Sequence, residues 1–106
     1  MLERVTDLFT VVAEPTRRRI LAELRGSDSS VGELVERLAL PQPTVSKHLK
    51  VLRDNGFVRS RTDAQRRIYR LDGRAFAELD TWLSPYRELW EHNLDRLEEL
   101  LDEEDS

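Results

Sequence analysis

The chain has 106 residues, 39% of them hydrophobic and 36% charged, a composition typical of one small folded domain rather than a disordered segment. It contains no cysteine, which excludes a disulfide framework and a thiolate metal site. The formal net charge of -4 hides an asymmetry, because residues 37–70 carry nine Lys or Arg against two acids (+7) and residues 71–106 carry three Arg against twelve acids (-9). The basic segment is therefore expected to bind a polyanion.

The first residues, MLERVTDLFTVVAEP, mix acids and an arginine with apolar residues, unlike a signal peptide. No apolar run approaches the roughly 18 residues that suggest a membrane span. We therefore expect a cytoplasmic protein that has no membrane partner.

Three helices are predicted in the first 40 residues. Apolar residues at helical spacing predict a first helix that ends near Ala13, and a second helix from Pro15 to Gly26 follows. The polar SDSS segment that comes next is expected to form a loop. Ser30 and Glu33 are spaced as a capping box, which predicts the start of a short third helix.

A fourth helix and a hairpin are predicted next. The helix spans about residues 41–54 and stops at Asn55 and Gly56, and the short turn before it is typical of a helix-turn-helix. Pro41 cannot supply the side-chain oxygen of an N-cap. The runs FVRSR and RRIYRL then predict a β-hairpin over residues 57–71. Its TDAQ tip lacks glycine, so we expect a longer connection based on a type I turn rather than a two-residue turn.

Helical spacing returns at residue 73 and continues to about residue 101. Ser84-Pro85 is expected either to kink this helix or to begin a new one. The acidic residues 102–106 are expected to form a frayed tail after a single domain of residues 1–101. The predicted fold is therefore mainly α with a small β-hairpin, in the order of a winged helix-turn-helix.

In a winged helix-turn-helix, the second helix of the pair enters the major groove and the hairpin, or wing, lies along the DNA backbone. Val45, Leu49 and Leu52 share one helical face, so the opposite face is free to read bases or phosphates. The expected reader residues are Gln42, Thr44, Ser46, Lys47, His48 and Lys50. The expected wing contacts are Arg59, Arg61, Gln65, Arg66 and Arg67, with Arg70 as a further cation on the same strands.

These basic residues also have a less specific interpretation. Lys47 and Lys50 could simply keep an amphipathic helix soluble. The five arginines on two short strands would repel one another unless an anion relieves them, which favours phosphate contact. His48 lies between the reader face and the packing face, so it either packs in a hydrogen bond or contacts DNA.

Arg17, Arg18 and Arg19 stand in the first turn of a predicted helix, where the macrodipole disfavours cations. Arg17 lies on the inward side and is expected to bond a carbonyl or carboxylate rather than DNA. Arg18 and Arg19 could equally be plain surface residues or phosphate contacts. No catalytic set of residues can be assembled, so we expect neither an enzyme nor a cofactor.

The segments EPTRRRILAEL, VGELVERL, PQPTVSKHLKVLRDNGFVRSR and RRIYRL together resemble the ArsR-type (ArsR/SmtB-like) winged helix-turn-helix repressors. The resemblance implies a homodimer that represses its own operon by binding an inverted repeat in double-stranded DNA. Val31 and Gly32 stand where metal sensors of the family often have a Cys pair. The last helix offers only Glu91 and His92, which do not face each other. No metal site is therefore expected, and the segment PYRELWEHNLDRLEEL also resembles the C-terminal helix of a metal-free branch of the family.

The apolar stripe of the C-terminal helices could form an intrachain core, a partner interface or a ligand pocket. We expect a symmetric dimer interface because the first helix also needs cover. Its expected residues are Leu2, Val5, Leu8, Phe9, Trp82, Tyr86, Leu89, Trp90, Leu94, Leu97 and Leu101.

Two other functions stay open. One is a ligand-responsive sensor of the same family, with a pocket near Trp82, Tyr86 and Trp90, although no effector can be named from the sequence. The other is a winged-helix module whose basic face binds an acidic protein.

Overall fold

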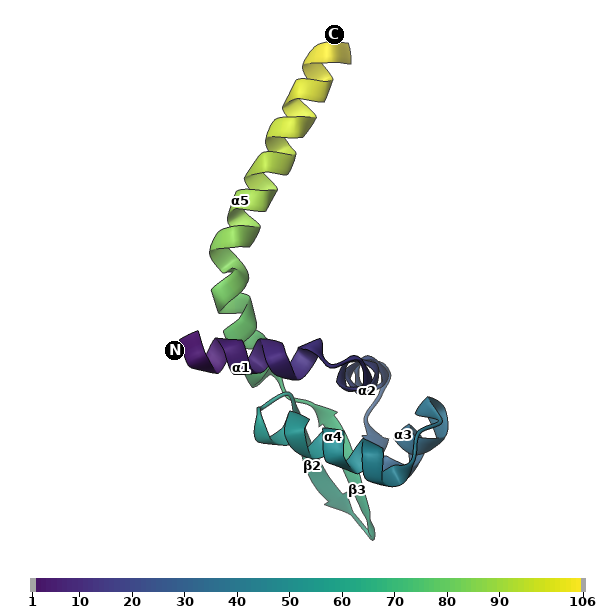
Figure 1. Cartoon of the computed structure of the whole chain (residues 1–106). Coiled ribbons are helices and arrows are strands. Elements are labelled where there is room, and N and C mark those ends of the chain that lie inside the picture. Colours follow the sequence, from purple (N-terminus) through teal and green to yellow (C-terminus); the bar gives the residue numbers. More distant parts are fainter. Residues whose placement is uncertain (1, 106) are drawn as a thin grey trace.

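The computed structural model describes residues 2–105, and their elements confirm the winged helix-turn-helix fold. The elements are α1 (Leu2–Ala13), α2 (Pro15–Gly26), β1 (Ser29–Ser30), α3 (Val31–Leu38), α4 (Gln42–Asp54), β2 (Val58–Asp63), β3 (Arg66–Leu71) and α5 (Gly73–Asp105). The first four helices gather around one end of a small sheet, and α5 projects away from them (Figure 1).

The start of α3 is fixed by the capping box that the sequence predicts. The Ser30 hydroxyl accepts a hydrogen bond from the Glu33 backbone N–H at 3.2 Å, and the Glu33 carboxylate accepts one from the Ser30 N–H at 3.0 Å. Hydrogen bonding of the Glu33 carboxylate by the Ser30 backbone N–H, and then by the Ser30 side chain, holds the pKa of Glu33 below its usual value. The predicted ends of α1 and α2 are confirmed as well.

The segment expected to be a loop before α3 contains a strand. Ser29 and Ser30 form β1 and pair antiparallel with Tyr69 and Ile68, so the sheet order is β1-β3-β2. Both serines are buried, and the Ser29 hydroxyl donates to the Ser27 carbonyl at 3.1 Å. A polar strand of two residues has no periodic signal of its own, because its backbone partners lie on the distant hairpin.

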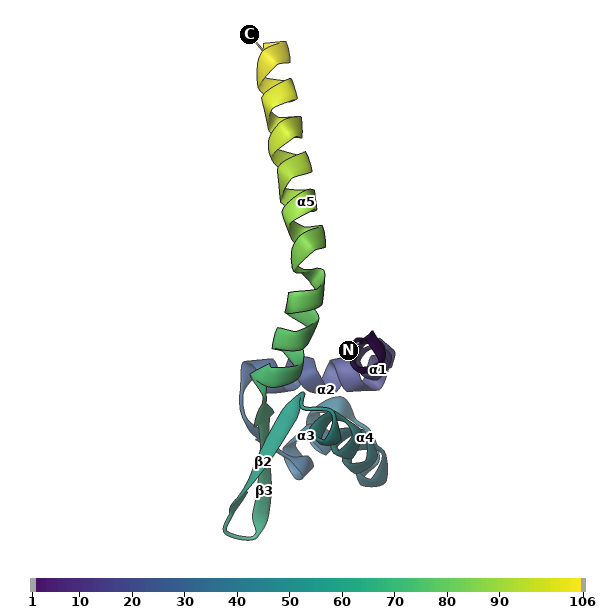
Figure 2. The same ribbon diagram turned by 90° about the vertical axis from the view of Figure 1, so that its left-hand side faces the viewer.

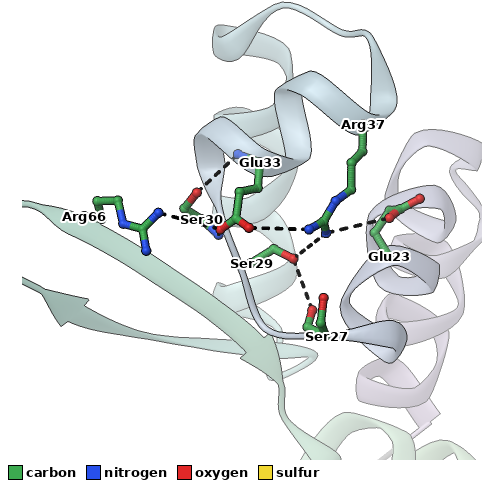
Figure 3. A network of polar contacts seen from close by, with 7 residues as sticks. All are labelled: Glu23, Ser27, Ser29, Ser30, Glu33, Arg37 and Arg66. Atoms are coloured by element: carbon green, nitrogen blue, oxygen red, sulfur yellow. Dashed lines mark hydrogen bonds and ion pairs between the residues drawn. The ribbon is translucent and has the colours of Figure 1, made fainter.

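A network of polar side chains surrounds β1 (Figure 3). Arg37 on α3 donates to the Ser29 hydroxyl at 2.9 Å and lies 4.0 Å from the Glu23 carboxylate on α2. Glu33 lies 3.4 Å from Arg37 and 3.9 Å from Arg66 on β3. The network thereby joins the second helix, the helix-turn-helix and the hairpin.

The hairpin turn is shorter than expected. Asp63 pairs with Arg66, which leaves a turn of two residues, Ala64 and Gln65, so the prediction of a longer connection is wrong. Ala64 adopts the left-handed region with φ 57°. That conformation costs a residue with a side chain about 1 kcal/mol, which is why the absence of glycine argued against a tight turn.

The core lies between the helices and the inner end of the hairpin. Phe57, which precedes β2, is fully buried and meets Phe76 of α5 edge to face at 5.1 Å. Other fully buried apolar side chains of the described residues are Leu8, Ile20, Leu34, Val45, Leu49, Leu52, Val58 and Ala75. Leu8 was expected in the dimer interface, but it is buried by its own chain and has no area left to offer a partner.

The C-terminal segment is one continuous helix rather than two. Pro85 lies inside α5 and cannot donate the usual hydrogen bond to the preceding turn. Both views show the helix bending in its first half, which agrees with the expected kink (Figures 1 and 2). The helix also includes residues 102–105, which we expected to fray. No helix within residues 2–105 is long and apolar enough to cross a membrane.

Asp72 joins the hairpin to α5. Its carboxylate is only 1% exposed and caps α5 by accepting from the Arg74 N–H at 3.0 Å. The Arg74 guanidinium lies 2.7 Å away and that of Arg59, on β2, 3.4 Å away. Hydrogen bonds from Arg74 and then Arg59 outweigh the burial of the carboxyl and lower the pKa of Asp72 to about 2.

Asp72→Asn should lower the free energy of unfolding at pH 7 by about 2 kcal/mol. Because the folded-state pKa is depressed, the stabilisation is complete above the ordinary value of 3.8 and is lost as the pH falls through about 2. Urea unfolding at several pH values should therefore show the wild type and variant converging in acid. Asp80→Asn, which removes an exposed partner of Arg87, is the control and should change stability little. A difference for Asp72→Asn that is constant from pH 7 to pH 2 would contradict this account.

Candidate nucleic-acid interface

Helix α4 exposes one polar face because its other face completes the core. Val45, Leu49 and Leu52 are fully buried, whereas Ser46 and Lys47 are exposed on the opposite side. Among the remaining expected reader residues, Gln42 and Lys50 are exposed and Thr44 is half-buried. No side chain caps the start of α4, as expected from Pro41. The residues expected to read DNA therefore do share a surface, with His48 at its edge.

The two lysines on this face differ in their surroundings. Lys50 donates to the Asp54 carboxylate at 2.9 Å, one turn further along α4, and this bond lowers the pKa of Asp54. Lys47 has no hydrogen bond or ion pair with any other described residue. Lys47 is therefore the cation on this face whose charge is not already partnered.

His48 is held by a hydrogen bond from α2. Its side chain is 15% exposed, and its Nδ1 accepts a hydrogen bond from Arg17 Nε at 3.2 Å. The neutral ring in this arrangement carries its proton on Nε2. Glu14 lies 3.8 Å from the same Nδ1. The structure thus supports the packed, hydrogen-bonded interpretation, and a DNA contact by His48 stays a prediction.

The three consecutive arginines of α2 cap other helices. Arg17 donates to the Val11 carbonyl at 3.3 Å, which confirms the prediction of a structural bond, and Arg18 donates to Ala13 at 2.7 Å. Arg19 donates to the Leu38 carbonyl at the end of α3, at 3.1 Å. Cations near the carbonyl ends of α1 and α3 interact favourably with those dipoles, which offsets their unfavourable place at the start of α2. The sequence left the roles of Arg18 and Arg19 open because their acceptors lie on other elements.

The arginines of the wing fall into two groups. In the first group, each arginine faces a carboxylate. Arg59 lies 3.4 Å from Asp72, Arg61 lies 3.3 Å from Asp28, and Arg66 lies 3.9 Å from Glu33. Arg67 and Arg70 are exposed and have no ion pair or hydrogen bond with other residues in the described range 2–105. Gln65 is exposed in the turn itself. Sequence reasoning missed the three acidic partners, since only the folded sheet brings them near the hairpin.

Helix α4, which carries Lys47, and the tip of the hairpin, near which Arg67 stands, lie at the same end of the molecule (Figure 1), whereas Arg70 pairs with Arg59 at the inner end of the hairpin. The tip of the hairpin extends beside α4, on the opposite side of the body from the C-terminal end of α5 (Figures 1 and 2). Arg67 pairs in register with Thr62 near this tip. The positive charge of residues 37–70 is thereby separated from the acidic α5.

The residues expected at a dimer interface lie mainly on α5. Phe9 and Trp82 meet edge to face at 5.4 Å where α1 crosses α5, and Val5 packs partly against the core. The α5 members, Trp82, Tyr86, Leu89, Trp90, Leu94, Leu97 and Leu101, are all exposed. The same helix also exposes Phe76, Leu83 and Leu100, which the sequence prediction omitted although they continue the apolar spacing. The side chain of Leu2 lies outside the described part.

Comparison with known proteins places these features in a family. Residues 12–61 match a family model described as a helix-turn-helix domain. The HTH-type transcriptional regulator Rv2034 of Mycobacterium tuberculosis is 38% identical over 96 residues, which cover 91% of this chain and 87% of that protein. The HTH-type transcriptional repressor SmtB of the same species is 39% identical over 71 residues, 67% of this chain, and the chain spans about half (53%) of its length.

A crystal structure of an ArsR family transcriptional regulator superimposes with a TM-score of 0.74 and 30% sequence identity. The superposition covers 86% of this chain and 94% of that protein. These relatives are regulators of transcription rather than enzymes. The chain belongs to the ArsR/SmtB family of winged helix-turn-helix transcriptional regulators.

Proposed function

We propose that this chain is a homodimeric transcriptional repressor that binds an inverted-repeat operator, including one at its own operon, in the cytoplasm. The observation that carries the proposal is a pair of exposed cations with no partner among residues 2–105, Lys47 on α4 and Arg67 near the tip of the hairpin that extends beside α4 (Figure 1). A duplex that meets this end would present phosphates to both. The name of the related SmtB protein, a transcriptional repressor, supports repression as the outcome.

The proposed docking places α4 in the major groove. Ser46 and Lys47 would face base edges there, because Ser can donate or accept and Lys can donate to guanine. The wing would lie along the backbone, where Arg67 neutralises a phosphate. Repression then follows from occupancy, since a protein that fills a promoter's grooves excludes the polymerase.

The proposed dimer explains the apolar surface of α5. A helix that exposes an unbroken stripe of Leu, Trp and Tyr side chains is unfavourable in water and is typical of an association surface. A two-fold dimer would present two α4 helices to successive major grooves about 34 Å apart. The acidic α5 would lie away from DNA and orient the approach of the basic end.

A gel-shift titration tests the proposed function. Sequences selected from random DNA should contain an inverted repeat, and the chain should bind them far more tightly than a scrambled duplex. The log of the affinity should fall with log salt by about 0.9 for each neutralised phosphate. Equal binding to selected and scrambled duplexes, or a flat salt response, would count against an operator-binding repressor.

Single substitutions should separate base reading from phosphate contact. Lys47→Ala is expected to cost about 1–3 kcal/mol on the selected operator and to relax its sequence preference, whereas Arg67→Ala should weaken all duplexes alike and reduce the salt slope by about one. Fluorescence anisotropy with operator and scrambled duplexes gives both quantities. Lys50→Ala is the matched comparison on the same helix, and its effect should be smaller because Lys50 already bonds Asp54. If Lys47→Ala and Arg67→Ala weakened both duplexes identically, α4 would lose its place as the reader.

A further inference from the structure

Two carboxylates outside the hairpin hold arginines of the wing. Arg61 on β2 donates a hydrogen bond to Asp28 at 3.3 Å. Arg66 on β3 lies 3.9 Å from Glu33, and Figure 3 shows this second pair. Asp28 directly precedes β1, and Glu33 stands in the first turn of α3. Both acids therefore belong to the body of the domain, and each meets an arginine that the sequence predicts as a phosphate contact.

The two acids stand on fixed backbone. Glu33 accepts from the Ser30 N–H at 3.0 Å in the capping box, and Asp28 adjoins Ser29, which is buried and paired with Tyr69. The two arginine side chains are long and flexible, and they remain 56% and 61% exposed. A phosphate that approaches the hairpin can therefore reach either guanidinium, but only in competition with a carboxylate that is already there.

The register of the hairpin separates these two arginines from Arg67. Arg66 pairs with Asp63, and Arg67 pairs with Thr62. Residues opposite each other in an antiparallel pair share a face and successive residues alternate, so Arg61 and Arg66 stand on one face of the hairpin and Arg67 on the other. The first two cations are neutralised from the side of the body, whereas Arg67 has no partner within residues 2–105.

We propose that Asp28 and Glu33 set the affinity of this regulator for DNA by withholding Arg61 and Arg66 from phosphate. This inference rests on the proposed function, since it assumes that the wing lies along the DNA backbone. A guanidinium paired with a carboxylate adds little net charge to the surface, so it displaces fewer counterions from DNA than a free guanidinium. The contacts of α4 with bases then account for a larger share of the total affinity.

This role differs from that of a base-reading residue in being independent of DNA sequence. An arginine released from Asp28 or Glu33 meets phosphate rather than a base edge, so it strengthens binding to every duplex by the same factor. The expected factor is about two- to fivefold for each acid, the range that exposed ion pairs contribute. The released charge also makes the affinity depend more steeply on salt.

Fluorescence anisotropy on the full chain tests the proposal. Asp28→Asn and Glu33→Gln each remove one charge and keep the shape of the side chain, and glutamine also serves in a capping box. Each variant should bind selected and scrambled duplexes about two- to fivefold more tightly than the wild type, with a salt slope steeper by up to about 0.9.

Glu36→Gln is the matched control. It makes the same change at an exposed position of α3, and Glu36 has no ion pair with any residue in the described range. Its effect on affinity and on the salt slope should be smaller than that of Asp28→Asn. Equal gains for the two variants would overturn the proposal, because the effect would then follow from net charge alone.

A second background shows whether Asp28 acts through Arg61, since neither residue has another ion pair within residues 2–105. In an Arg61→Ala background, Asp28→Asn should leave the affinity nearly unchanged, because no guanidinium is left to release. A gain as large as in the wild type would overturn the proposal, and so would wild-type affinity and salt slope for Asp28→Asn alone. A wild-type chain that binds no selected duplex would instead overturn the proposed function itself.

Discussion

The buried carboxylate of Asp72 is the interaction on which the geometry of the molecule depends. The carboxylate caps α5 by accepting from the Arg74 N–H, and it pairs with the Arg59 guanidinium on β2. The backbone N–H of Asp72 donates to the Phe57 carbonyl at 2.9 Å. The hairpin and the long helix thereby share one fixed point. This side chain therefore helps to set the angle between the wing and α5, and hence between the proposed DNA-binding end and the proposed dimer surface.

Arginine serves three different purposes in this chain, and the structure separates them. Arg17, Arg18 and Arg19 stabilise the carbonyl ends of neighbouring helices. The wing arginines that face Asp28, Glu33 and Asp72 are partly neutralised, which limits the mutual repulsion of cations on two short strands. Only a minority of the basic side chains remain for a polyanion. A count of positive charge therefore overstates the number of phosphates that the surface can bind.

The sequence predicted the helices well because their ends are encoded locally. Pro15, the Ser30 and Glu33 pair, and Gly56 act within a few residues of where they stand, so a single sequence reveals them. The helical spacing of the apolar residues Val45, Leu49 and Leu52 likewise predicted which face of α4 is polar and exposed.

Features created by contacts between distant segments were missed. The strand β1 exists because β3 offers it a partner, and the two-residue turn exists because the strands on either side hold Ala64 in an unfavourable conformation. Likewise, Leu8 has the spacing of an interface residue, yet tertiary packing buries it completely. The carboxylate partners of the wing arginines also come from elements that only the fold brings close.

The bond between Arg17 and His48 has a consequence for how such a regulator can change over evolutionary time. It fixes the rotation of α4 about its own axis through a residue of α2 that bonds the Val11 carbonyl of α1. In the proposed docking, substitutions at the junction of α1 and α2 would therefore alter which base edges α4 meets, although they never approach a base. Operator preference would then be open to selection at positions that make no contact with DNA.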